Sequence, residues 1–188
     1  MGRWEPNARE RLAKAALELY SERGYEQTTV AEIAKLAGLT ERTFFRHYAD
    51  KREVLFGGSM ALQELFVHTV TEAPESAAPI DVMAAALETV SEVFVGRREY
   101  SRQRYAVIAA NAELQERELI KLASLASALT DALRLRGVAE PAASLTAEAG
   151  IAVFKVGFER WIAAAEERTM SHFMRESLDE LKAVTAGD

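Results

Sequence analysis

Apolar residues recur along this chain every three to four positions, which is the period of an amphipathic helix. The first such stripe consists of Leu12, Ala16, Leu19 and Tyr20. It lies between Pro6 and Gly24, and because proline suits the first turn of a helix and glycine its end, the pattern predicts a helix over Pro6–Arg23. No alternating run favours a strand over a helix, so we expect an all-α fold of about nine helices.

Two short helices are predicted next. Thr29 and Glu32 have the spacing of a capping box, which starts a helix that ends at Gly38. Thr40 then caps a third helix over roughly 41–47. Two short helices that are joined by a glycine turn and preceded by a longer helix have the layout of a helix-turn-helix.

A fourth helix is expected to begin at a cap on Asp50 and to run roughly to Thr71. Gly57 and Gly58 lie within it and mark a weak point or a close-packing site, since each glycine costs ~1 kcal/mol relative to alanine. A connector rich in Pro, Ala and Ser follows. Further helices are predicted near 80–95, 97–110, 113–136, 142–166 and 170–185.

The charge of the chain is unevenly distributed. Its net charge is −6, yet residues 1–56 hold 10 Lys and Arg against 9 Asp and Glu, whereas the remaining residues hold 13 against 20. A first quarter without an excess of acid fits a small DNA-facing head on an acidic body, because DNA repels negative charge. We therefore expect two domains, one over 1–53 and one over 54–188.

The composition argues against several classes of protein. Without cysteine, and with three histidines far apart in sequence, the chain offers no evident metal site, disulfide or thiol nucleophile. It has no glycine-rich phosphate loop and no serine elbow, so we expect neither an enzyme nor a bound cofactor. It has no apolar run long enough to span a bilayer and no signal-peptide block at its N-terminus, so we expect a cytoplasmic protein.

One segment is both apolar and basic: LTERTFFRHYADK, residues 39–51. In a helix-turn-helix the third helix packs one face inside and inserts the other into the major groove. Phe44 falls on the inward stripe. The residues expected outward or at the edge are Thr40, Glu41, Arg42, Thr43 and Arg46. Arginine can read guanine and a threonine methyl can pack on thymine, while Lys51 at the start of the fourth helix would reach a phosphate.

These residues also carry a family resemblance. The chain closely resembles the DNA-binding head of TetR/AcrR-type transcriptional regulators over roughly residues 8–56, through the run TTVAEIAKLAGLTERTFFRHYADKREVLF. The resemblance implies an all-α homodimer with a three-helix DNA-binding head and a larger body that binds a small molecule. For most such regulators it further implies repression that the ligand relieves.

The resemblance also assigns residues to DNA. Those placed nearest base edges or flanking phosphates are Thr40, Arg42, Thr43 and Arg46. Those placed to support or contact the DNA backbone are Thr29, His47, Tyr48 and Lys51. Phe45 occupies a position where the family commonly has a tyrosine whose hydroxyl touches phosphate. Phenylalanine cannot donate that hydrogen bond, so the contact is lost or is replaced by a neighbour such as Arg46.

In the body, aromatic residues at helical spacings are expected first as core and second as the lining of a ligand pocket. The pocket candidates, with three polar residues added, are Phe66, Phe94, Arg102, Tyr105, Asn111, Phe154, Phe158 and Trp161. Arg98, Arg102 and Tyr105 would place cations and a hydroxyl on one helix face, as polar anchors within an apolar bundle. A surface row of arginines paired with Glu99 or Glu113 is an equally open interpretation.

The sequence thus indicates a ligand-responsive, sequence-specific DNA-binding transcriptional regulator. In its simplest form it is a repressor that a small apolar or aromatic molecule releases from a pseudo-palindromic operator. Dimerisation is expected through the last two helices, about 142–185, as a four-helix bundle. The alternative is a helical small-molecule carrier or interaction module with a non-functional head, which Phe45 and Glu41 would favour.

Overall fold

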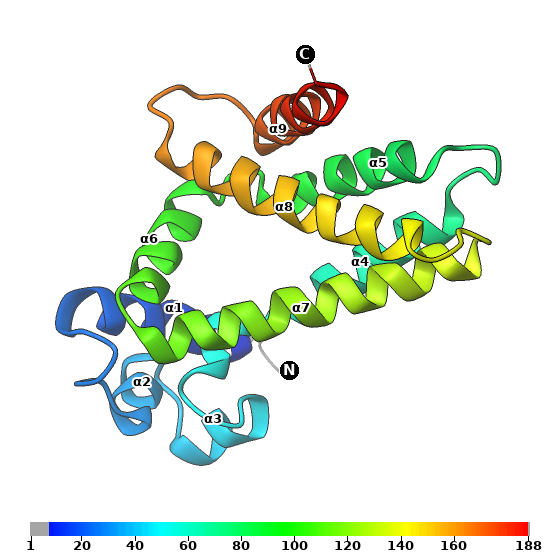
Figure 1. Ribbon diagram of the computed structural model, residues 1–188. Coiled ribbons are helices and arrows are strands. Elements are labelled where there is room, and N and C mark those ends of the chain that lie inside the picture. Colours follow the sequence, from blue (N-terminus) through cyan, green and yellow to red (C-terminus); the bar gives the residue numbers. More distant parts are fainter. Residues whose placement is uncertain (1–7, 188) are drawn as a thin grey trace, which may run out of the picture. The chain divides into compact units, whose positions relative to one another are not determined.

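The computed structural model describes residues 8–187, and this part of the chain consists of helices joined by turns (Figure 1). No strand occurs within these residues, so the expected all-α fold is confirmed. The helices are α1 (Ala8–Arg23), α2 (Val30–Leu36), α3 (Glu41–His47), the 3-10 helix η1 (Glu53–Phe56), α4 (Ser59–Glu72), α5 (Pro79–Ser91), the 3-10 helix η2 (Glu92–Phe94), α6 (Arg98–Ala109), α7 (Ala112–Leu135), α8 (Ala142–Ala163) and α9 (Met170–Ala186). The predicted start of the first helix at Pro6 lies outside the described residues.

The described residues form two compact units. One, here called the head unit, comprises the described part of Met1–Ser59 together with Gln103–Leu119. The other, the body unit, comprises Met60–Arg102 and the described part of Ile120–Asp188. The expected boundary after residue 53 lies close to the end of the first stretch of the head unit. The second stretch was not expected there, and because of it α6 and α7 each contribute residues to both units.

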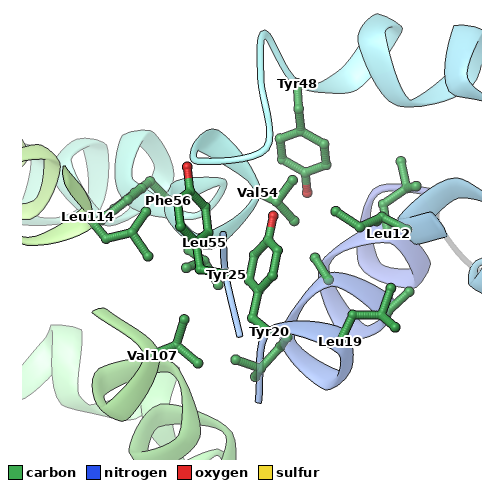
Figure 2. Close-up of a cluster of buried hydrophobic side chains, with 14 of the residues drawn as sticks. Leu12, Leu19, Tyr20, Tyr25, Tyr48, Val54, Leu55, Phe56, Val107 and Leu114 are labelled. Atoms are coloured by element: carbon green, nitrogen blue, oxygen red, sulfur yellow. The ribbon is translucent and has the colours of Figure 1, made fainter. Parts of the chain in front are cut away.

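The core of the head unit joins α1, α2, α3 and η1 to that distant second stretch. All residues of the predicted first stripe are buried, namely Leu12, Ala16, Leu19 and Tyr20. Val107 and Ile108 of α6 and Leu114 of α7 belong to the same buried cluster. Figure 2 shows Val107 and Leu114 facing the group of side chains that surrounds Phe56. The head therefore completes its core with side chains that are far away in sequence.

Local signals start and end α2 and α3 as predicted. The Thr29 amide donates to Glu32 Oε2 at 2.9 Å and the Glu32 amide donates to Thr29 Oγ1 at 3.3 Å, which confirms the capping box. Hydrogen bonds donated by the Thr29 amide and the Thr29 hydroxyl hold the pKa of the Glu32 carboxyl below its usual value. Gly38 turns the chain after α2 with a φ of 65°, in the left-handed region that favours glycine. Thr40 then accepts from the Thr43 amide at 3.2 Å and caps α3.

The expected continuous helix from Asp50 to Thr71 is wrong, because a turn at Gly57–Gly58 separates η1 from α4. Asp50 instead holds the turn before η1, since its Oδ1 accepts from the amides of Arg52 and Glu53 at 2.8 and 3.2 Å. The hydrogen bonds from Arg52 also hold the pKa of the Asp50 carboxyl below its usual value. The α-helix that was predicted to start at Asp50 thus begins only at Ser59, after the short 3-10 helix η1 and the two glycines.

In the body unit, α8 packs against α5 and α9 (Figure 1). Two glycines of α8 lie at these crossings. A β-carbon on Gly150 would lie 2.5 Å from Met83 Sδ of α5. One on Gly157 would lie 3.2 Å from the Phe173 carbonyl oxygen of α9. Glycine at these two positions therefore allows α8 to pack closely against α5 and α9. Across residues 8–187, no helix is both long and apolar enough to cross a membrane. Within the same residues, no group of three or more His, Cys, Asp or Glu side chains could hold a metal ion.

Candidate nucleic-acid interface

One side of α3 presents a continuous set of side chains to solvent. An open hollow of ≈ 470 Å³ on this side is lined by Arg42, Thr43, Phe45 and Arg46. The two arginines and Phe45 are exposed, whereas Thr43 is half-buried. Phe44 is fully buried. The helix therefore has the two faces that were expected of it, an apolar face toward the core and an outward face with two guanidinium groups.

The guanidinium groups of Arg42 and Arg46 are available for binding. Within residues 8–187 neither takes part in a hydrogen bond or an ion pair. A guanidinium carries five N–H donors in a fixed planar arrangement, which matches the O6 and N7 acceptors of guanine or two phosphate oxygens. Both side chains can make such contacts without breaking an internal interaction.

Thr29 and Thr40 serve first as helix caps. The Thr40 hydroxyl oxygen accepts from the Thr43 amide and also lies 3.0 Å from the Thr43 hydroxyl. The Thr29 hydroxyl is likewise engaged with Glu32. These threonines hold the first turns of α2 and α3 in place. A contact of any of them with DNA stays a prediction.

Tyr48 is a core residue, which fits a supporting role in the head, while a direct contact with DNA stays a prediction. Its side chain is buried, and its hydroxyl donates to the Arg9 carbonyl oxygen at 3.1 Å. The Arg9 guanidinium lies 5.5 Å from the centre of the same ring. The neighbouring His47 is half-buried, and its Nε2 atom is buried with no hydrogen-bond partner among residues 8–187. That nitrogen is therefore not presented to a DNA backbone.

Lys51 points toward the protein rather than outward to a phosphate. Its ammonium group donates to the carbonyl oxygens of Tyr25 at 2.9 Å and Thr28 at 3.2 Å, and lies 4.3 Å from the centre of the Tyr25 ring. The Tyr20 hydroxyl donates to the Lys51 carbonyl oxygen at 2.7 Å. Burial raises the pKa of the Tyr25 hydroxyl to about 12, so the ring stays neutral. Lys51 thus ties the loop before α2 to the start of η1.

We expect Lys51→Met to lower the thermal stability of the protein. The substitution removes the ammonium donor from the carbonyl oxygens of Tyr25, Glu26 and Thr28. The loss of a hydrogen bond to a charged group costs ~1.5–3 kcal/mol. Thermal unfolding followed by circular dichroism measures the effect. The matched control is Lys35→Met, since Lys35 is an exposed lysine of α2. Equal melting temperatures for the two variants would restore the phosphate contact as the main role of Lys51.

This surface is supported by two arginines, Arg11 and Arg52. No local sequence signal had indicated this role. Arg11 Nη2 of α1 donates to the Ala37 carbonyl oxygen at 2.5 Å, at the end of α2. The Arg52 guanidinium pairs with Asp50 at 2.6 Å and with Glu113 of the second head stretch at 2.9 Å. Ala37 and Glu113 lie far from these arginines in the sequence, so only the folded structure reveals these two contacts. Together they fix the turn before α3 and the segment after it.

The aromatic pocket candidates form one cluster in the body unit. Its members are Phe66, Phe94, Phe154, Phe158 and Trp161. The ring centre of Phe94 lies 5.9 Å from that of Phe158 and 6.0 Å from that of Trp161. The ring centres of Phe66 and Phe154 lie 5.8 Å apart. Phe94, Phe154 and Phe158 are half-buried, whereas the other two are buried. The cluster offers an apolar, aromatic surface that is not fully closed off.

Of the three polar candidates, Arg102 is engaged within the body unit, whereas a place of Tyr105 or Asn111 in a ligand pocket stays a prediction. Arg102 Nε donates to the Ile162 carbonyl oxygen at the end of α8 at 2.9 Å, and its Nη1 pairs with Glu99 at 3.1 Å. The alternative of a surface arginine paired with Glu99 is therefore confirmed. Tyr105 and Asn111 belong to the head unit, where the Asn111 amide donates to a carbonyl of α6 at 2.6 Å.

Comparison with known proteins bears on the head in particular. Residues 12–56 match the family described as bacterial regulatory proteins, tetR family. The HTH-type transcriptional regulator TcmR of Streptomyces glaucescens is 39% identical over 82 residues, which are 44% of this chain and 36% of TcmR. The matched stretch therefore spans about a third of the length of that relative.

The likeness in fold covers nearly the whole chain. FadR from Bacillus subtilis, solved in complex with stearoyl-CoA, has a TM-score of 0.60 at 19% identity, over 92% of this chain and 96% of FadR. SmeT, the repressor of the Stenotrophomonas maltophilia multidrug efflux pump SmeDEF, has a TM-score of 0.58 at 19% identity, over 95% of this chain and 90% of SmeT. At such identities the likeness concerns the fold, with its helix-turn-helix head and helical body.

Proposed function

We propose that this chain, a member of the TetR family of bacterial regulatory proteins, is a cytoplasmic, sequence-specific DNA-binding transcriptional regulator that responds to a small molecule. Its simplest action is repression, in which two heads of a homodimer hold a pseudo-palindromic operator until an effector releases them. The observation that carries this proposal is the outward side of α3. There Arg42 and Arg46 are exposed and unengaged by residues 8–187, while Phe44 fixes the opposite side in the core.

The proposed mechanism follows from this geometry. α3 enters the major groove, where arginine can read guanine through O6 and N7. Two heads of a dimer reach half-sites ~34–36 Å apart, one helical turn of DNA. Contacts with phosphates release counterions, so binding should weaken steeply as salt is raised.

The aromatic cluster of the body unit supports an effector of apolar or aromatic character. Phe94, Phe154 and Phe158 leave part of their ring surface accessible, and such a surface suits an apolar ligand. FadR from Bacillus subtilis was solved with stearoyl-CoA, but a likeness at 19% identity gives the fold alone, so we propose only the chemical class. The effector must bind the DNA-incompetent state more tightly, and operator DNA must then weaken effector binding by the same factor.

A homodimer through α8 and α9 is the second part of the proposal. α8 exposes an apolar stripe of Leu145, Ala152 and Val156, with Leu145 66% and Val156 50% accessible in the single chain. The spacing of these residues places them along one side of the helix. An exposed apolar stripe is a suitable contact for the same stripe of a second copy.

The experiment that tests the proposal is selection of bound sequences from a random duplex library by the purified protein. Enrichment of one pseudo-palindrome is the expected result, and its sequence then serves as the probe. On that probe we expect Arg42→Ala to weaken binding by ~1–3 kcal/mol and to relax the preference at one base position, as loss of a base-reading arginine does. Fluorescence anisotropy titrations on a panel of single-base operator variants measure both effects.

The control for this substitution is Arg97→Ala, which removes an exposed arginine from the body unit. It should leave affinity and base preference unchanged. Absence of any enriched sequence at low salt would contradict the proposal and favour the carrier or interaction module. A second outcome is that an operator is enriched but that Arg42→Ala and Arg46→Ala bind it as tightly as the unaltered protein does. In that case α3 would not be the element that reads the sequence.

A further inference from the structure

Phe45 is an apolar side chain on an otherwise polar and basic surface. It is 55% exposed, and it lines the same hollow as Arg42, Thr43 and Arg46. Its ring is not loose, because it stands edge-on to the buried Phe44, with ring centres 5.4 Å apart and planes at 80°. The ring therefore contacts the core on one side, while about half of its surface faces outward.

The order of side chains around α3 places this ring beside a guanidinium group. Residues follow one another at about 100° around a helix, so the outward side runs from Phe45 through Arg42 and Arg46 to Thr43. Phe45 thus forms one edge of the DNA-facing set and borders Arg42. Two cations on this side favour DNA as the partner of the ring over an apolar protein surface, which would have to desolvate them.

The chemistry of the major groove narrows what the ring can contact. Base edges there present hydrogen-bond donors and acceptors, and their distinct apolar group is the C5 methyl of thymine. A phenyl ring against a donor or an acceptor would desolvate that group without replacing its hydrogen bond. A phenyl ring against the methyl group removes apolar surface of both partners from water.

We propose that Phe45 is a specificity-determining residue that packs on the C5 methyl group of a thymine, adjacent to the base pair contacted by Arg42. This inference rests on the proposed function of the head and deepens it. It predicts that each operator half-site contains one thymine that is required for its methyl group alone, independently of its hydrogen bonds. The Thr43 side chain also carries a methyl group, so the test must separate the two residues.

The experiment replaces each thymine of the selected operator, one at a time, by deoxyuridine. This change removes the C5 methyl group and leaves base pairing and the O4 acceptor intact. At one position per half-site we expect affinity to fall about fourfold, the loss that corresponds to burial of roughly one methyl group. Fluorescence anisotropy at constant salt gives the Kd values for the two duplexes.

The same pair of duplexes is then measured with three variants. Phe45→Ala should bind the thymine and uracil duplexes equally, because the partner of the methyl group is gone. Phe45→Tyr should keep the fourfold difference, since it retains the ring. Thr43→Ser, the matched control, should also keep the difference although it removes the threonine methyl. The Kd values of the unaltered protein and of Phe45→Ala, each on the thymine and the uracil duplex, form a double-mutant cycle that isolates the ring–methyl interaction.

The outcomes separate this inference from the proposed function. An operator that is bound specifically but shows no sensitivity to uracil overturns the role of Phe45 and leaves the regulator intact. If the loss of affinity for the uracil duplex persists in Phe45→Ala and disappears in Thr43→Ser, the methyl contact belongs to Thr43. That result also overturns the inference. Failure of the unaltered protein to select any sequence overturns both the inference and the function on which it rests.

Discussion

Leu114→Ala is expected to destabilise the DNA-binding head by ~2–5 kcal/mol, although Leu114 lies far from the helix-turn-helix in sequence. The side chain is 0% exposed and belongs to the buried cluster around η1 and α1. Its removal would leave a cavity in the head core, which a closely packed interior cannot fully close. Chemical denaturation followed by circular dichroism measures the loss, and operator affinity should fall at temperatures where the variant begins to unfold.

The control lies on the same helix. Leu119 is 59% exposed, so Leu119→Ala should change the free energy of unfolding by no more than ~0.5 kcal/mol. The two substitutions remove the same atoms from neighbouring turns of α7 and differ in burial. Identical denaturation curves for both variants would show that the segment 103–119 does not contribute to the core of the head.

Gly157→Val is expected to destabilise the body unit by ~3 kcal/mol, at the upper end of what overpacking of a core typically costs. A β-carbon at this position would meet the Phe173 carbonyl oxygen at 3.2 Å and the Met174 α-carbon at 3.3 Å. Both are backbone atoms of α9 and cannot move aside as the end of a side chain can. α8 and α9 would be forced apart, and a dimer built on them would be weakened as well. Thermal unfolding and analytical ultracentrifugation measure the two effects.

Gly58→Val provides the comparison, because a β-carbon there has no neighbouring atom within 4 Å and the backbone is not left-handed. Its melting temperature should stay close to that of the unaltered protein. If Gly157→Val melted at the same temperature as Gly58→Val, the close approach of α8 and α9 at this position would be refuted.

The parts of the fold that short-range signals encode could be predicted from the sequence. Thr29 and Glu32 are three residues apart, and Thr40 stands directly before its helix, so the caps of α2 and α3 follow from the local sequence. Gly38 marked the turn between them for the same reason. The inward position of Phe44 followed from helical periodicity, and with it the outward position of the two arginines.

The parts that depend on distant partners could not be predicted in this way. Lys51 has the same local sequence whether it binds a phosphate or the Tyr25 and Thr28 carbonyl oxygens, and only the folded loop decides between them. The Tyr48 hydroxyl likewise finds its acceptor at Arg9, on another helix. Arg102 was predicted to anchor a ligand, but its guanidinium binds a carbonyl oxygen of α8. Helical spacing alone cannot distinguish these two roles.

The contribution of residues 103–119 to the head core also has a consequence for synthesis on the ribosome. The helix-turn-helix is made first, but Val107 and Leu114, which complete its core, follow much later. At about 5–20 residues per second, the roughly 60 residues between Phe56 and Leu114 take ~3–12 s to add. During that interval the nascent head carries an unfinished apolar face. The head reaches its final form only when the chain has been translated well into the body.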